Sequence, residues 1–271
     1  MRIFKVQIIL LLVIPFLLLS CTTVPVTGRK QFSIIPTSTM LSTSFQQYDE
    51  FMKTNKLSSN EEQTRLVRDV GEKIRKAVEI YFEEKEMSHE IDNYNWEFNL
   101  VESEEVNAWA MPGGKVVVYE GLLPITKDEA GLASVLGHEI AHAIAKHGNE
   151  RMSQVLIAQM SGMALSKALE EKPGKTQQLW MTAFGIGTQF GVILPYSRLH
   201  ESEADHIGLI FMIMAGYDPN SAIEVMERLG AVNNGQKPPE FLSSHPSSEA
   251  RIRKIKEAIP EAMKYYKKSG L

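Results

Sequence analysis

The residues best suited to chemistry lie in one short stretch, His138-Glu139-Ile140-Ala141-His142. On a helix, residues four apart share a face and lie about 6 Å apart along the axis, so both imidazoles can reach one metal ion. Two imidazoles suit Zn²⁺, which takes nitrogen ligands at about 2.0–2.1 Å. Beside the metal, a carboxylate can take a proton from a water molecule and pass it to a leaving amine. The stretch therefore predicts His138 and His142 as metal ligands and Glu139 as catalytic base. The plainer alternative is a helix whose two histidines are structural.

A catalytic zinc also needs a third protein ligand and one open position. Residues 197–208 are rich in carboxylates, and Glu201 and Asp205 lie four apart on one face of a predicted helix. Glu201 would complete a site of two histidines and one glutamate that binds one zinc ion per chain. Asp205 can accept the other ring N–H of a ligand histidine and so fix its tautomer. Spacing alone leaves open that this segment is only a solvated, charged helix face.

The elements that must hold these residues are predicted to be mostly helical. Capping boxes at Ser59–Glu62 and Thr126–Glu129 begin two helices, and the second should carry the HExxH motif as far as His147. Residues 95–119 alternate in polarity around Pro112-Gly113-Gly114, which predicts a small antiparallel sheet. The expected fold class is therefore α+β, mostly helical.

Residues 176–194 form an apolar stretch with Gly187 and Gly191 at a spacing found between membrane helices. Polar residues interrupt the stretch, and it is short for a membrane span. We expect a buried helix or an apolar hairpin here. The methionine-rich residues 152–163 are expected to belong to the core.

The N-terminus resembles a secretory signal. Two positive charges precede an almost wholly apolar run that ends at Leu18-Leu19-Ser20-Cys21, which resembles a bacterial lipobox with Cys21 as the lipidated residue. The alternative is an uncleaved membrane anchor. We expect a lipoprotein signal peptide over residues 1–20, a lipidated tether over residues 21–58 and the folded domain over residues 59–271. This predicts a cell-envelope protein, lipid-anchored in the outer membrane and facing the periplasm.

The composition places further bounds on the function. The chain has 271 residues, of which 44% are hydrophobic and 23% are charged, as in ordinary globular proteins. A net charge of −4 gives no reason to expect a nucleic-acid partner. Its one cysteine, Cys21, excludes an internal disulfide.

Four blocks of sequence resemble the zinc endopeptidase family that includes HtpX, BepA, LoiP, the Oma-type proteases and the CAAX prenyl proteases. They occur in the family's order and cover nearly the whole chain after the signal. VPVTGRKQF, which follows Cys21, is similar to lipoprotein members. The four blocks are NAxxxPGGxxxxxxGLL at Asn107–Leu123, GHEIAHxxxxH at Gly137–His147, SRxxExEADxxG at Ser197–Gly208 and a His-Pro turn followed by Arg-Ile within Ser244–Ile252.

The resemblance implies a gluzincin-like zinc metallopeptidase domain over residues 59–271. It makes His138, His142 and Glu201 the zinc ligands. In the same way it makes Glu139 the catalytic base and Asp205 a partner of the ligands.

The resemblance also bears on substrate binding. The strand after Pro-Gly-Gly is similar to the edge strand on which such enzymes lay an extended substrate, and main-chain pairing holds a peptide without reading its side chains. His245 would lie near the active site, where it could stabilise an oxyanion, occupy zinc's open position and keep the enzyme latent, or serve only the turn. The predicted substrate strand comprises Lys115, Val116, Val117, Val118 and Tyr119.

We therefore expect a zinc metalloendopeptidase of the bacterial cell envelope. Its partners would be extended or unfolded proteins and, through the anchor, a membrane. It would cleave unfolded or misassembled envelope proteins. The alternative is an assembly factor or chaperone whose zinc site serves binding with little or no turnover. An intact Glu139 argues against a purely structural zinc site, because such a site needs no base.

Overall fold

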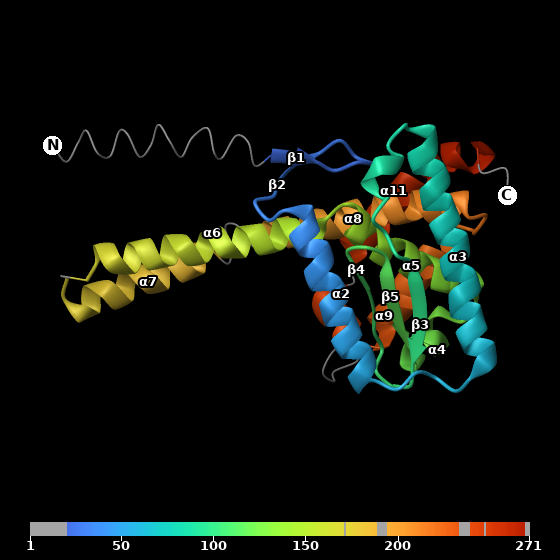
Figure 1. Ribbon diagram of the computed structural model, residues 1–271, viewed down its shortest axis with the longest axis horizontal. Coiled ribbons are helices and arrows are strands. Elements are labelled where there is room, and N and C mark those ends of the chain that lie inside the picture. Colours follow the sequence, from blue (N-terminus) through green and yellow to red (C-terminus); the bar gives the residue numbers. More distant parts are fainter. Residues whose placement is uncertain (1–20, 171, 189–193, 233–238, 247, 269–271) are drawn as a thin grey trace.

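The computed structural model describes residues 21–170, 172–188, 194–232, 239–246 and 248–268. The predicted signal peptide, residues 1–20, lies outside this range. The described residues form a helical body around one small sheet, and a pair of helices projects from it (Figure 1). This arrangement confirms the expected fold class, a mostly helical α+β domain.

The two predicted helices are present, but their N-caps are Asn60 and Asp128, not Ser59 and Thr126 as the capping boxes predicted. Asn60 accepts a hydrogen bond from the N–H of Gln63 at 3.0 Å, and Asp128 accepts one from the N–H of Gly131 at 2.8 Å. The α-helices are α2 (Thr37–Thr54), α3 (Glu61–Glu84), α4 (Leu123–Thr126), α5 (Glu129–Ile144), α6 (His147–Ala168), α7 (Gly174–Thr188), α8 (Leu194–Met214), α9 (Asn220–Val232), α10 (Glu240–Ser244) and α11 (Glu249–Ala262). Short 3-10 turns lie at Ser88–Glu90, Glu120–Leu122 and Met263–Lys268.

The helix that carries the HExxH motif is shorter than predicted. α5 ends at Ile144, and Lys146 adopts a left-handed conformation with φ 57° before α6 begins at His147. On an unbroken helix, residues five apart point roughly 140° away from each other. The break at Lys146 lets His147 turn back toward His142, so the end of α5 is also part of the site.

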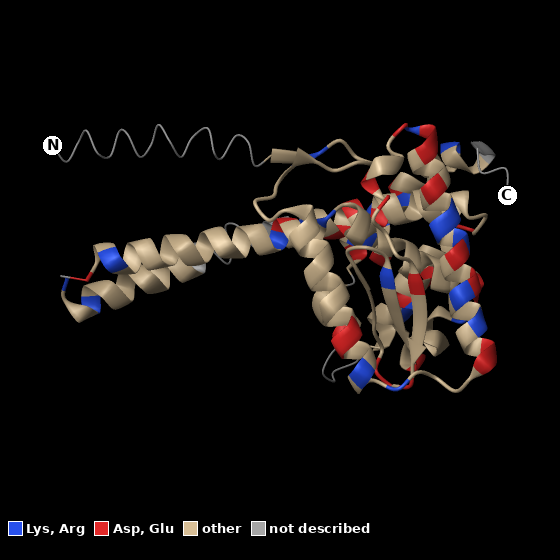
Figure 2. Cartoon of the chain, viewed as in Figure 1, with Lys and Arg blue, Asp and Glu red and all other residues tan. Residues whose placement is uncertain are grey.

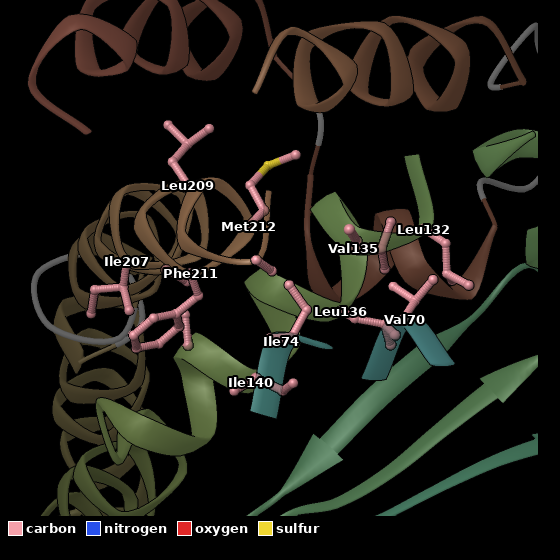
Figure 3. Packing of buried hydrophobic residues seen from close by; sticks show 14 of the residues in the cluster. Val70, Ile74, Leu132, Val135, Leu136, Ile140, Ile207, Leu209, Phe211 and Met212 are labelled. Atoms are coloured by element: carbon pink, nitrogen blue, oxygen red, sulfur yellow. The ribbon is translucent and has the colours of Figure 1, made fainter. Parts of the chain in front are cut away.

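The hydrophobic core surrounds α5. Leu132, Leu136 and Ile140 of this helix are fully buried, as are Ile74 of α3 and Phe211 of α8. Figure 3 shows these side chains packed between the three helices. Burial of each such side chain contributes about 1.5–3 kcal/mol, so the ligand-bearing helix is held on several sides.

The sheet next to α5 has the strand order β3-β5-β4, with β3 at Glu97–Val101, β4 at Ala108–Met111 and β5 at Lys115–Tyr119. β4 pairs antiparallel with β5 through the predicted Pro-Gly-Gly turn, but β3 runs parallel to β5. The sheet is thus mixed, not wholly antiparallel as expected. The reason is that β5 enters between the two earlier strands.

Residues 21–58 do not form an extended tether. They form the hairpin of β1 (Cys21–Thr23) and β2 (Lys30–Phe32), followed by α2. α2 packs on the sheet, where the Tyr48 hydroxyl donates to Glu97 at 2.9 Å and Phe51 contacts the Trp109 ring edge-to-face. Cys21 is exposed, and its lipidation stays a prediction.

α6 and α7 form the projecting pair of helices, which we call the arm. Residues 152–166 and 176–188 carry no charge, so the shaft of the arm is tan in Figure 2. Met163 and Trp180 are largely exposed. The expectation that the methionines of residues 152–163 belong to the core is therefore corrected. The described part of the apolar stretch, residues 176–188, is one half of a helical hairpin. Residues 189–193 lie outside the described range. Among the described helices, none is long and apolar enough to span a membrane.

Candidate metal centre

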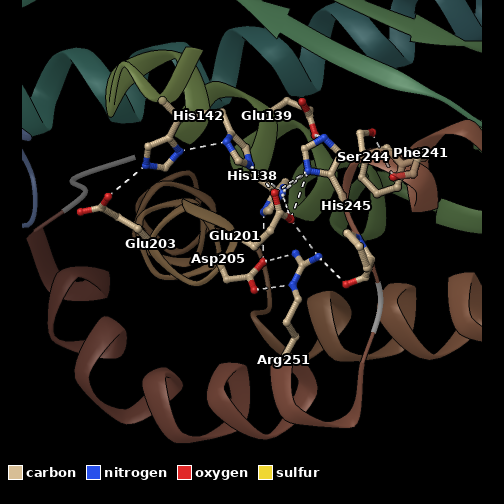
Figure 4. A network of polar contacts seen from close by, with 12 residues as sticks. His138, Glu139, His142, Glu201, Glu203, Asp205, Phe241, Ser244, His245 and Arg251 are labelled. Carbon is tan, nitrogen blue, oxygen red and sulfur yellow. Dashed lines mark hydrogen bonds and ion pairs between the residues drawn. The ribbon is translucent and has the colours of Figure 1, made fainter. Parts of the chain in front are cut away.

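α5, α8 and the segment after α10 bring four potential ligands together. One ligand atom from each of His138, His142, Glu201 and His245 lies within 4.8 Å of the other three (Figure 4). His138 Nε2 is 3.1 Å from His142 Nε2 and 3.4 Å from the nearer Glu201 oxygen. The three ligands predicted from sequence therefore meet at one point, and His245 joins them.

The donor set fits zinc. Imidazole nitrogens and one carboxylate are ligands that Zn²⁺ prefers, and two ligand atoms at about 2.1 Å from a tetrahedral ion lie roughly 3.4 Å apart. The distance from His138 Nε2 to Glu201 Oε2 is 3.4 Å, and so is the distance from His142 Nε2 to Glu201 Oε1. Two facing imidazole nitrogens repel each other unless a cation or a proton lies between them. The cluster can therefore hold a metal ion.

Asp205 lies where the sequence predicted, on the outer side of His138. Its Oδ1 is 3.0 Å from His138 Nδ1, and the Arg251 guanidinium donates to both Asp205 oxygens at 2.6 and 2.9 Å. Burial opposes ionisation of Asp205, but His138 and Arg251 outweigh it and lower its pKa to about 2. Asp205 is thus a carboxylate that holds Nε2 of His138 toward the cluster.

Glu139 is placed to act as a base. It is only 3% exposed, and its Oε1 has no hydrogen-bond partner among the described residues. His245 Nε2 lies 3.5 Å from the same oxygen. Burial raises the pKa of the Glu139 carboxyl. A buried carboxylate with a free oxygen beside the ligands is suited to receive a proton from a water molecule there.

The open side of the cluster faces a pocket whose lining includes Glu139, His142, His245, Ala110 and Pro112. The last two residues belong to β4 and the turn that follows it. The catalytic candidates and a sheet strand therefore face one space.

The substrate strand predicted from sequence is wrong for a topological reason. β5, which comprises Lys115, Val116, Val117, Val118 and Tyr119, is paired on both sides and has no free edge. The edge strand is β4. Asn107 accepts a hydrogen bond from the N–H of Tyr119, so by alternation the main-chain groups of Ala108 and Ala110 point away from β5. The free edge beside the pocket therefore lies at Ala110.

Sequence reasoning missed the residues behind His142. It placed His147 only at the end of the helix and gave Glu203 no role. In the structure His147 Nδ1 is 2.9 Å from His142 Nδ1, and His147 Nε2 is 2.9 Å from Glu203. Arg29 donates to Glu203 at 2.8 Å. The only sequence signal for Arg29 was its place in VPVTGRKQF.

Comparison with known proteins assigns this arrangement to one family. The model of peptidase family M48 matches residues 68–259. The mitochondrial metalloendopeptidase OMA1 of Schizosaccharomyces pombe is 40% identical over 173 residues, which are 64% of this chain and 49% of the relative. Human mitochondrial OMA1 is 33% identical over 181 residues, 64% of this chain and 34% of the relative. The β-barrel assembly-enhancing protease of Escherichia coli is 28% identical over 176 residues, 57% of this chain and 32% of the relative.

Two facts follow from these relatives. The matched part of this chain spans about half of their length or less. The OMA1 proteins come from yeasts, a plant and mammals and are named as mitochondrial. This finding contradicts the predicted location of a lipoprotein in a bacterial outer membrane, and we correct that expectation.

Proposed function

The chain belongs to peptidase family M48, and on this basis we propose that it is a zinc-dependent endopeptidase that cleaves extended segments of other proteins. The observation that carries the proposal is the buried Glu139 oxygen beside His138, His142 and Glu201, which has no hydrogen-bond partner among the described residues. A site that only stabilised the fold would need no buried carboxylate next to the ligands.

The metal, Glu139 and the main chain at Ala110 each have a separate role in the proposed reaction. When bound, zinc would polarise the scissile carbonyl and lower the pKa of a water molecule. Glu139 takes the proton of the attacking water and returns it to the leaving amine. The main chain at Ala110 pairs with the substrate as an added strand, which holds it across the pocket.

We propose that His245 keeps the site latent in this conformation. Its Nδ1 is 3.2 Å from His138 Nε2 and 3.0 Å from Glu201, within the ligand group itself. The backbone N–H of His245 donates to Phe241 at 2.8 Å, and the two rings are in contact. A fourth protein ligand fills the position that a catalytic zinc keeps open. The role of oxyanion donor would require His245 to leave the cluster.

The substrates that fit this site are unfolded or misassembled proteins. A folded protein rarely offers an unpaired extended segment, whereas strand addition at Ala110 needs one and does not depend on its side chains. One relative is named as a protease that enhances β-barrel assembly. Quality control of such proteins is therefore the function we propose.

A cleavage assay on the purified full-length chain tests the proposal. Unfolded casein and a tightly folded protein would be offered in parallel, with chelator and then with added zinc. We expect cleavage of casein only, lost with chelator and restored by zinc. The alternative, an assembly factor or chaperone, predicts bound zinc and suppressed aggregation of casein without cleavage. The His245→Ala variant separates a latent enzyme from a binding protein, because only a latent enzyme would cleave casein once His245 is removed.

A further inference from the structure

A cluster of buried polar residues lies on the Nδ1 side of His142, and one of its members, His147, also lines the pocket. It contains His147, Glu150 and Glu203, whose side chains are 1–5% exposed. Their cation comes from the N-terminal hairpin. Arg29 donates to Glu150 at 2.7 and 3.1 Å and to Glu203 at 2.8 Å. Arg29 thus joins α6 to α8, the helix that carries Glu201.

The hydrogen bonds of this cluster follow one order. A metal ion on Nε2 of His142 would require the ring proton on Nδ1, from which it donates to His147 Nδ1, 2.9 Å away. His147 must then be protonated at Nε2, which donates to Glu203 Oε2 at 2.9 Å. Arg29 Nε donates to the same oxygen. Each donor meets one acceptor, and this order leaves Nε2 of His142 free for a metal.

The arrangement parallels the one behind His138. There, Asp205 faces the outer nitrogen of the ligand and Arg251 holds Asp205. Behind His142, the carboxylate and its arginine are the same types of group, with one histidine inserted between them. Partners of this kind fix the tautomer and the ring orientation of a metal ligand.

We propose that Arg29 is a positioning residue for the metal ligand His142, acting through Glu203 and His147. Without the guanidinium, two buried carboxylates lose their counter-ion, and Glu203 is free to move away from His147. Thr27 also donates to Glu203, and Val24 anchors the same hairpin in the core with 0% exposure. Residues 21–32 thereby become part of the active site, although they lie outside the family match at residues 68–259.

The inference rests on the zinc site that the proposed function requires, so its test measures zinc and not cleavage. The dissociation constant for zinc would be measured by competition with a chromogenic chelator in the full-length chain, in Arg29→Gln and in His147→Gln. We expect about a 10–100-fold weaker affinity in each variant. The visible spectrum of bound Co²⁺ should shift in both variants, because His142 no longer holds its position.

The matched control is Arg228→Gln. Arg228 is similarly buried, with 22% of its side chain exposed against 18% for Arg29, but it donates to the carbonyls of Ile125 and Thr126. Its replacement should lower thermal stability and leave zinc affinity unchanged. If Arg29→Gln does not fold, Arg29→Lys takes its place, since it keeps a positive charge in the cluster.

The double variant, Arg29→Gln with His147→Gln, decides whether Arg29 acts through His147. If it does, the fold-loss of zinc affinity in the double variant is close to the larger of the two single fold-losses, not to the product of the two. Multiplied losses, or wild-type affinity in Arg29→Gln despite a lowered melting temperature, would show that Arg29 only fastens the hairpin. A wild-type chain that binds no zinc would overturn the proposed function as well.

Discussion

The backbones of Gly137 and Gly208 touch where α5 packs against α8: a methyl group on Gly208 would lie 2.9 Å from the carbonyl carbon of Gly137. Gly137 precedes His138, and Gly208 lies two turns after Glu201, both of which are proposed metal ligands. This contact sets how closely the two ligand-bearing helices approach each other. The distance between the histidines and the glutamate therefore depends on two residues without side chains.

Gly208→Ala should separate the helices. We expect a loss of about 1–3 kcal/mol in the free energy of unfolding, as for other overpacked sites, together with weaker zinc binding. Gly148→Ala is the control, because a methyl group there meets nothing within 4 Å and alanine favours a helix. Urea unfolding and zinc titration measure both effects. Unchanged zinc affinity in Gly208→Ala would mean that this contact does not set the ligand spacing.

Ala110→Pro tests the edge strand. Proline has no N–H, so one main-chain hydrogen bond to the substrate is lost, and kcat/KM for an unfolded substrate should fall roughly 5–10-fold. Ala110→Val keeps the N–H and serves as the control. Zinc content should be that of the wild type in both. Equal kcat/KM in the two variants would remove Ala110 from substrate binding.

His245→Ala should increase the rate of cleavage. Removal of the imidazole opens one position beside His138 and Glu201, while three ligands remain to hold zinc. Cleavage of casein at saturating zinc measures the effect, with Ser244→Ala as a neighbouring control. A lower rate with zinc retained would instead support the role of oxyanion donor.

Glu150 should make stability depend on acid pH. Burial opposes its ionisation, but His200 and Arg29 outweigh burial and lower its pKa from 4.5 to about 2. A lowered pKa stabilises the fold above the unfolded value, and this stabilisation is lost as pH falls from about 4.5 to 2. In metal-free protein, wild type should therefore lose more unfolding free energy between pH 5 and pH 2.5 than Glu150→Gln does. Parallel losses would contradict the lowered pKa.

Local signals in the sequence predicted much of this molecule. The helix that carries His138 follows from its apolar period, although its N-cap is Asp128 and not the predicted Thr126. The convergence of Glu201 follows from a second helix with carboxylates on one face. Strand order was not predictable, because alternation marks β4 and β5 without saying which is central. Apolar composition alone suggested a core for the methionines of α6, whereas the arm exposes several of them.

The cluster behind His142 was beyond sequence reasoning for another reason. Arg29 and Glu203 are 174 residues apart, and each side chain alone resembles an ordinary surface charge. Their meeting depends on the hairpin of β1 and β2, and the left-handed turn at Lys146 brings His147 to them. Tertiary packing, not local propensity, produces that part of the site.

One paired measurement decides whether Glu139 is the base of a zinc peptidase. Zinc content and casein cleavage would be determined in the same preparations of His245→Ala and of His245→Ala with Glu139→Gln, so that latency does not mask activity. We predict equal zinc in both and a loss of at least about 100-fold in cleavage when Glu139 is replaced. Cleavage that survives Glu139→Gln with zinc bound would contradict the account.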